Sequence, residues 1–87
     1  MSLRERLLDA LIDGQIGRGL VVTRKELMGH FSGDPPTYTG VLLSNAEMRT
    51  GQHSPTYEHF TLRMGRGRYR IHPGALSRRM RQRALLP

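Results

Sequence analysis

Cysteine is absent from this chain, which excludes disulfide bonds and thiolate metal sites. Long apolar stretches are absent too, and runs of only a few apolar residues are too short to cross a membrane as a helix. The first residues lack the apolar segment of a signal peptide. We therefore expect a cytoplasmic protein without a membrane partner. At 87 residues the chain predicts a single domain with one small core and no elaborate internal active site.

Acidic residues are nearly missing from the second half of the chain. Residues 1–48 hold five basic and six acidic residues, whereas residues 49–87 hold nine arginines and only Glu58 as an acid. The net charge of +7 therefore resides in the C-terminal half, which indicates a polyanionic partner. Lysine is scarce as well, since the chain has thirteen arginines and one lysine. Arginine can bind phosphate or guanine through two hydrogen bonds at once, although a GC-rich genome produces the same bias toward arginine.

Residues 60–72 alternate apolar and polar side chains on either side of Gly65-Arg66-Gly67, which predicts a β-hairpin with a tight turn. Because successive strand residues point to opposite faces, we expect one apolar face made of Phe60, Leu62, Met64, Tyr69 and Ile71. The opposite face is expected to be cationic and to hold Arg63, Arg68, Arg70 and His72, with Arg66 at the tip. A solvated surface normally mixes both signs of charge, so arginines without a nearby acid favour phosphate contacts.

Helices are expected on both sides of a short β segment at Leu20–Val22. Capping-box spacing predicts helix starts at Ser2 and at Thr23. A third helix is predicted from Asp34 to about Arg49 or Thr50, because Pro35 suits a first helical position. Its predicted inner face comprises Tyr38, Val41, Leu42, Asn45 and Ala46. Its outer face is expected to be small and polar, and to comprise Pro36, Thr37, Gly40, Ser44 and Glu47, with Thr39 on the flank. Residues 75–86 predict a last helix, or alternatively a frayed tail.

This element order, with the glycine-tipped basic hairpin, resembles the winged helix-turn-helix family over about residues 2–72. The resemblance implies an α+β fold of three helices and a C-terminal β-hairpin wing in residues 1–74, followed by a basic C-terminal helix or tail in residues 75–87. It implies a DNA-binding protein, such as a small transcriptional regulator or accessory factor, that acts as a monomer or a homodimer on double-stranded DNA.

Under this resemblance the third helix and the wing supply the nucleic-acid contacts. Base edges would be met by Pro36, Thr37, Thr39, Gly40 and Ser44, and phosphates or the minor groove by Arg63, Arg66, Arg68 and Arg70. The segment that follows the third helix adds Arg49, His53, Ser54 and Tyr57. Two departures from the family are that the outer helix face lacks Arg, Asn or Gln, and that Glu47 would repel phosphate. Binding through backbone charge, minor-groove shape or RNA is therefore an alternative to sequence-specific readout.

Two other function classes stay open at this point. A small basic ribonuclease would use His53, Glu58 or His59 as acid and base, with arginines stabilising the transition state. A protein-interaction module would use the apolar residues of the last helix, namely Leu76, Met80, Leu85 and Leu86. No metal or cofactor is predicted, because the histidine spacing matches no strong ligand pattern and the glycine pair lies in a hairpin.

Overall fold

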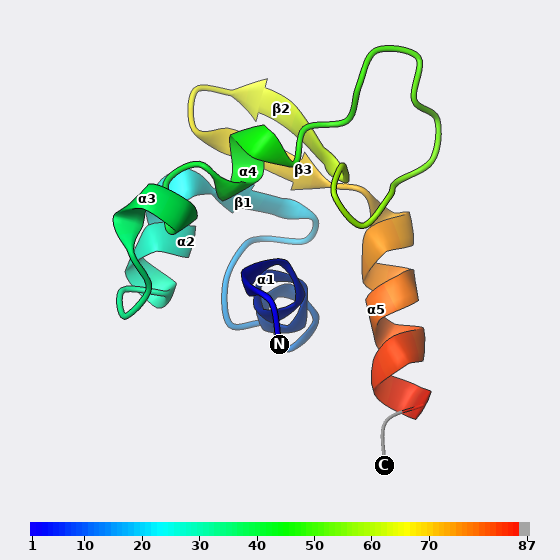
Figure 1. Ribbon diagram of the computed structural model, residues 1–87, viewed down its shortest axis with the longest axis horizontal. Helices are drawn as coiled ribbons and strands as arrows, with labels where there is room; N and C mark the ends of the chain where they lie inside the picture. Colours follow the sequence, from blue (N-terminus) through cyan, green and yellow to red (C-terminus); the bar gives the residue numbers. More distant parts are fainter. Residues whose placement is uncertain (86–87) are drawn as a thin grey trace.

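The computed structural model describes residues 1–85, which form an α+β domain with five helices and one three-stranded antiparallel sheet (Figure 1). In chain order the elements are α1 (Leu3–Ile12), β1 (Val21–Thr23), α2 (Arg24–His30), α3 (Pro36–Thr39), α4 (Leu42–Asn45), β2 (Thr61–Gly65), β3 (Arg68–Ile71) and α5 (Pro73–Leu85). Within residues 1–85, no helix combines the length and apolar character that a membrane crossing requires. Leu86, which we predicted as part of an apolar contact surface, lies outside the described residues.

Both expected capping boxes are confirmed. The Ser2 hydroxyl accepts a hydrogen bond from the Glu5 backbone N–H at 3.1 Å, and the Glu5 carboxylate accepts one from the Ser2 N–H at 3.0 Å. Thr23 and Glu26 repeat this arrangement at the start of α2, with both backbone bonds at 3.0 Å. Each motif satisfies two N–H groups that a helix start leaves without partners, so local sequence determines where these helices begin.

The sheet has the strand order β1-β3-β2, and β3 lies in its centre. The hairpin of β2 and β3 is confirmed, but the predicted assignment of faces is wrong for β2. In the observed register Leu62 pairs with Arg70 and Arg63 pairs with Tyr69. Cross-strand partners share a face, so Arg63 lies on the side of the buried Tyr69, whereas Leu62 lies on the side of Arg70.

The shift has two causes, one at each end of β2. Phe60 and Thr61 are both buried, and their successive N–H groups donate to the same acceptor, the Ala46 carbonyl, at 2.7 and 2.9 Å. The alternation therefore starts at Thr61 and not at Phe60. A register irregularity between Arg63 and Gly65 follows. In the turn Gly67 has a positive φ, at 68°, whereas Gly65 does not.

The single third helix predicted from Asp34 to about Arg49 is wrong, because the segment forms two separate turns, α3 and α4. Between them the Gly40 carbonyl accepts a hydrogen bond from Arg24 Nε at 2.7 Å, and Val41 has a φ of −118°. Glycine and a β-branched valine are weak helix formers, and an external donor for the Gly40 carbonyl stabilises the break.

The break also changes which residues of this segment face solvent. Thr39, expected on the outer flank, is only 2% exposed. Tyr38 and Val41, expected inside, are 64% and 43% exposed, and Asn45 is exposed as well. The buried side of α3 and α4 is instead formed by Thr39, Leu42, Leu43 and Ala46.

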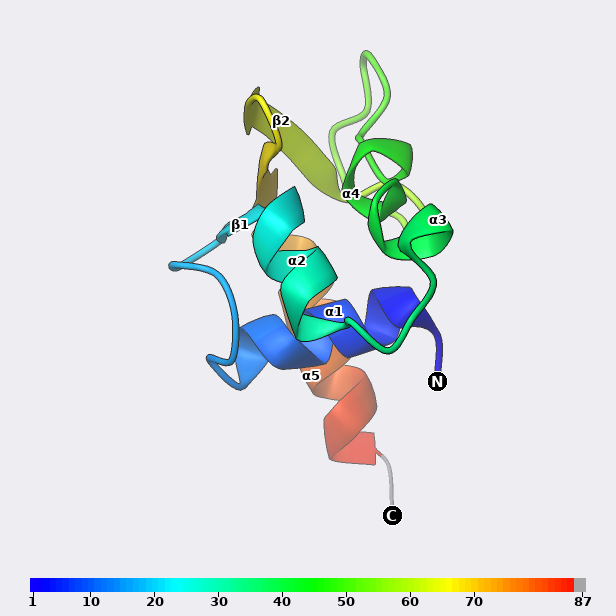
Figure 2. The ribbon, with the colours of Figure 1, turned by 90° about the vertical axis from the view of Figure 1, so that its left-hand side faces the viewer.

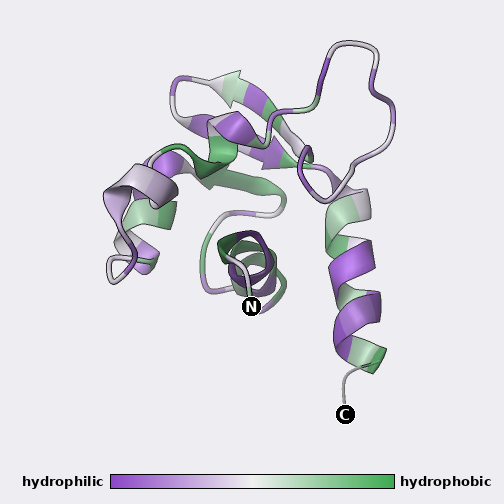
Figure 3. Ribbon diagram, in the orientation of Figure 1, coloured by the Kyte–Doolittle hydropathy of each residue, from purple (hydrophilic) through white to green (hydrophobic). Residues whose placement is uncertain are grey.

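The core lies between α1, the inner face of the sheet and the buried side of α4. Its largest fully buried side chains include Phe60, Leu7, Leu27 and Ile71. Figure 3 shows β1 as hydrophobic along its length, whereas α5 carries alternating hydrophilic bands. Figures 1 and 2 agree that the hairpin turn and the loop of residues 46–60 project from the same end of the domain, with α4 between them. Helices α1 and α5 lie toward the opposite end.

Candidate nucleic-acid interface

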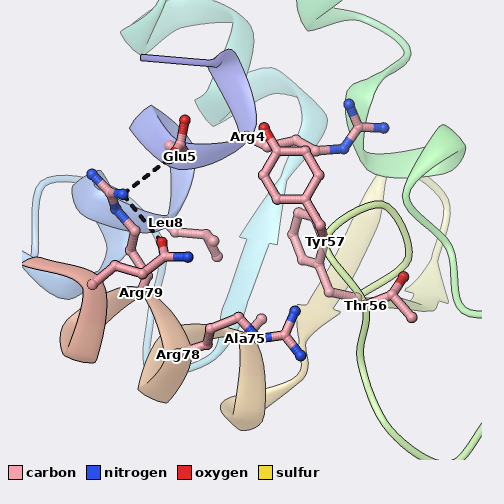
Figure 4. A pocket seen from close by; sticks show the side chains of 10 residues that line it. Arg4, Glu5, Leu8, Thr56, Tyr57, Ala75, Arg78 and Arg79 are labelled. Carbon is pink, nitrogen blue, oxygen red and sulfur yellow. Dashed lines mark hydrogen bonds and ion pairs between the residues drawn. The ribbon is translucent and has the colours of Figure 1, made fainter.

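Three of the seven acidic side chains, Glu5, Asp9 and Asp13, are held in ion pairs where α1 meets α5. Arg79 is 4% exposed, and its Nε and Nη2 donate to the two carboxylate oxygens of Asp9 at 2.8 and 3.0 Å. Its Nη1 donates to Glu5 at 3.1 Å (Figure 4). The remaining close pairs are Arg83 with Asp13 at 3.0 Å and Arg6 with Asp34 at 2.7 Å.

These contacts keep the carboxylates ionised. Hydrogen bonding from Arg79 lowers the pKa of Asp9, and the positive charges of Arg79 and Arg83 act in the same direction against the effect of burial. The pKa of Glu5 is lowered first by its bond to the Ser2 backbone and then by the Ser2 hydroxyl. Two arginines of the basic C-terminal segment, the buried Arg79 and the partly exposed Arg83, are therefore paired with carboxylates and contribute less to an external positive field.

The other cations form no ion pair with a carboxylate within residues 1–85. They are Arg4, Arg18, Arg24, Lys25, Arg49, Arg63, Arg66, Arg68, Arg70, Arg78 and Arg81. Only Glu26, Glu47 and Glu58 remain as acids outside the ion pairs of this part of the chain, and both oxygens of Glu26 bind backbone N–H groups. Apart from Arg6 with Asp34, the ion pairs of residues 1–85 lie at the α1–α5 contact, and the cations elsewhere in this part of the chain are without an ion-pair partner.

A cluster of these cations forms where α2 begins beside the hairpin turn. The Arg24 N–H donates to the Gly67 carbonyl at 2.8 Å, which fixes the turn against the first residue of α2. An open depression of about 380 Å³ at this junction is lined by Thr23, Arg24, Lys25, Arg66 and Gly67. Three cationic side chains and no acid line it, so it suits a phosphate group.

The hairpin arginines divide between the two faces of the sheet because of the observed register. Arg68 and Arg70 lie on the face away from the core, and Arg63 lies on the face of Tyr69 beyond the buried part of the sheet. Arg66 occupies the turn and is exposed. The predicted single cationic face of Arg63, Arg68 and Arg70 is therefore wrong, and Arg66 is the hairpin arginine that joins the cluster beside α2.

The loop of residues 46–60 is held in shape by the side chain of Gln52. Its Oε1 accepts from the Arg49 N–H at 2.9 Å, and its Nε2 donates to the carbonyls of Ser54 and His59 at 2.8 and 3.0 Å. This bracing leaves Arg49, His53 and Ser54 exposed on the loop. The loop that carries these three predicted contact residues lies at the same end of the domain as the hairpin turn (Figure 2).

Tyr57, the fourth predicted residue of this segment, has a structural contact. Its hydroxyl donates to the Ser2 hydroxyl oxygen at 2.7 Å and so ties the loop to the start of α1. Figure 4 shows Tyr57 beside Arg4, at a cavity of about 20 Å³ between α1, α5 and the loop. That volume is enough for a single water molecule.

The residues predicted to face base edges are only partly available. Pro36, Thr37 and Ser44 are exposed on α3 and α4. Thr39 belongs to the core, so its prediction as a contact residue is wrong. A Cβ at Gly40 would lie 2.9 Å from Arg24 Nη2, so the arginine side chain covers this glycine.

Comparison with protein-family models, with curated proteins and with solved structures found no match. Among residues 1–85, no three side chains of the metal-ligating types His, Asp and Glu gather into a group that could hold an ion.

Sequence reasoning missed Arg24, Lys25 and Gln52 as members of this candidate interface. The adjacent basic pair at the predicted start of α2 was a usable signal for the first two, whereas nothing local marked Gln52.

Proposed function

We propose that the chain is a winged helix-turn-helix domain that binds double-stranded DNA mainly through its phosphates. The hairpin is the wing in this proposal, and α2 with the α3–α4 segment is the helix-turn-helix. The observation that carries the proposal is the cluster of Arg24, Lys25 and Arg66 at the wing–α2 junction, without a lining acid. Such unpaired cations release counterions when they meet phosphates, which supplies sequence-independent affinity.

The broken α3–α4 segment supports a limited role for base readout. A continuous helix presents several side chains in register to the major groove, whereas α3 and α4 are each four residues long. Exposed Asn45 offers an amide that can bind adenine bidentately, and it lies beside Tyr38 and Val41. In our proposal any base preference comes from this side chain, and most of the binding free energy comes from phosphate contacts.

The decisive experiment measures the salt dependence of binding to a labelled duplex of random sequence by fluorescence anisotropy. Each phosphate contact contributes about 0.9 to the slope of log K against log salt concentration. The double variant Lys25→Ala, Arg66→Ala should therefore reduce the slope by about 1.8 and weaken binding to all duplexes alike. Arg81→Ala is the matched control, because Arg81 is exposed and unpaired within residues 1–85 but lies on α5. Equal slopes for wild type and the double variant would contradict the proposal.

Two further arms of the experiment separate the alternative functions. Double-stranded RNA should compete less well than duplex DNA of equal length, and a stronger competitor effect from RNA would assign the cluster to RNA. Incubation with labelled RNA and DNA tests the ribonuclease interpretation. Cleavage by wild type that His59→Ala abolishes would establish catalysis and overturn the proposed binding role.

A further inference from the structure

The face of the sheet that points away from the core carries two cross-strand rows of side chains. In one row, Arg70 of β3 lies between Val21 of β1 and Leu62 of β2. In the other, Arg68 pairs with Thr23 of β1, and Met64 lines the same depression as Arg68. We call these six residues the outer sheet face. Its centre is cationic, and its β2 side is apolar.

This apolar part is accessible to solvent. Leu62 is 40% exposed and Met64 is 53% exposed. An adjoining depression of about 360 Å³ is lined by Val21, Met64 and Arg68, together with Thr23, Arg18 and Glu26. Two neighbouring aliphatic side chains on the solvent side of a small sheet provide area that a partner can bury.

Two of the three arginines around this apolar area are uncompensated. Arg68 and Arg70 form no ion pair with a carboxylate within residues 1–85, whereas Arg18 lies close enough to Glu26 for its charge to lower the pKa of that carboxyl. Glu26, the acid that lines the depression, already accepts hydrogen bonds from Gly17 and Thr23 through its two oxygens. A partner for this face is therefore expected to bring carboxylates of its own.

Nucleic acid matches only half of this chemistry. Phosphates would pair with the arginines, but a sugar–phosphate backbone gains little from covering Leu62 and Met64, and none of the six residues is an aromatic ring on which a base could stack. A peptide that carries both carboxylates and aliphatic side chains satisfies the arginines and buries the apolar area together.

We propose that the outer sheet face docks an acidic segment with aliphatic side chains from a partner protein. This site adjoins the wing–α2 junction, because Thr23 lines both depressions. The junction is otherwise lined by Arg24, Lys25, Arg66 and Gly67 and by none of Arg68, Arg70, Leu62 or Met64, so the two proposed sites use different cations.

The test compares two short peptides of equal charge, one alternating Glu and Val and one alternating Glu and Ser. Binding to the isotopically labelled chain is followed by NMR at physiological salt. The Glu–Val peptide should shift the backbone amides of Leu62, Met64, Arg68 and Arg70. It should bind at least about tenfold more tightly than the Glu–Ser peptide, because two exposed aliphatic side chains become buried.

The double variant Leu62→Ser, Met64→Ser should abolish this tenfold preference, whereas Leu85→Ser should preserve it. Leu85 is the control because it is 85% exposed at the end of α5. Equal affinity for both peptides, or shifts outside the outer sheet face, would overturn the proposal. Retained peptide binding by Lys25→Ala, Arg66→Ala would separate this site from DNA binding. Loss of peptide binding in that variant would show that the two sites are one and would refute the inference.

Discussion

Replacement of Arg79 by methionine tests the contact that joins the two ends of the chain. Methionine keeps the apolar stem of the side chain but removes the cation that Asp9 and Glu5 share, and leaves Asp9 only the longer contact with Arg83 at 3.7 Å. Arg79 is 5% exposed at its side chain, and the two carboxylates are 20% and 28% exposed. An exposed pair contributes up to about 1 kcal/mol, whereas breaking a buried pair costs about 3 to 5 kcal/mol. For this partly buried arrangement we expect a loss of about 2 to 3 kcal/mol in the free energy of unfolding.

Urea unfolding and thermal melting at neutral pH measure this loss. For a domain of this size, 2 to 3 kcal/mol corresponds to a decrease in Tm of roughly 10 to 20 °C. Arg81→Met is the matched control on the same helix, because Arg81 is exposed and takes part in no ion pair within residues 1–85. It should change stability by less than about 0.5 kcal/mol. A similar loss in both variants would show that the effect comes from the helix and not from the ion pair.

A second check is the pH dependence of the stability difference between wild type and Arg79→Met. The pKa values of Asp9 and Glu5 are lower in the folded protein than their ordinary values. Their stabilising contribution is therefore present above the ordinary carboxylate pKa of about 4 and is lost as the pH falls through the lowered folded values. The stability difference between wild type and Arg79→Met should shrink below about pH 4. A difference that stays constant down to about pH 2 would refute the reasoning.

Two further predictions concern backbone positions, and both are measured by urea unfolding. Thr23→Ala removes the side-chain cap of α2 and should cost about 1 kcal/mol, whereas Thr37→Ala, at an exposed position, should cost little. Gly17→Ala should cost more than Gly14→Ala, although both glycines have a positive φ, of 79° and 71°. A Cβ added at Gly17 would lie 2.7 Å from a Leu11 methyl carbon and 2.9 Å from the Val21 carbonyl oxygen. A Cβ added at Gly14 would have no atom within 4 Å. Equal losses at the two glycines would contradict the steric argument.

The elements that sequence predicts well are those determined by neighbouring residues. Ser2 with Glu5 and Thr23 with Glu26 form complete capping boxes within four residues, so the starts of α1 and α2 could be read directly. The hairpin was predicted for the same reason, because its turn chemistry is local. The excess of positive charge in the second half of the chain could also be read from the sequence, whereas Arg24 and Lys25 of the proposed phosphate cluster lie in the first half.

The errors arise where contacts between distant residues decide the outcome. The apparent helix from Asp34 onward is interrupted at Gly40, whose carbonyl binds the Arg24 side chain 16 residues away in sequence. Likewise the faces of β2 follow from the bonds of Phe60 and Thr61 to Ala46, which no alternation pattern reveals. Arg79 is also paired with Asp9, which lies 70 residues away in sequence. A count of charges along the sequence treats Arg79 as a free surface cation, and this long-range ion pair cannot be seen in such a count.

Arg24 links the hairpin turn and the α3–α4 segment, which are the two parts of the proposed DNA interface. Its backbone binds one of them and its side chain binds the other. Its backbone N–H holds the Gly67 carbonyl of the hairpin turn, and its Nε holds the Gly40 carbonyl at the α3–α4 break. The position of the wing and the geometry of the α3–α4 segment are consequently not independent. Because both bonds form within the unbound chain, the backbone of the hairpin turn and of the α3–α4 break is held in position before any DNA binds. In our proposal fewer backbone segments then have to be ordered on binding, which lowers the entropic cost of association.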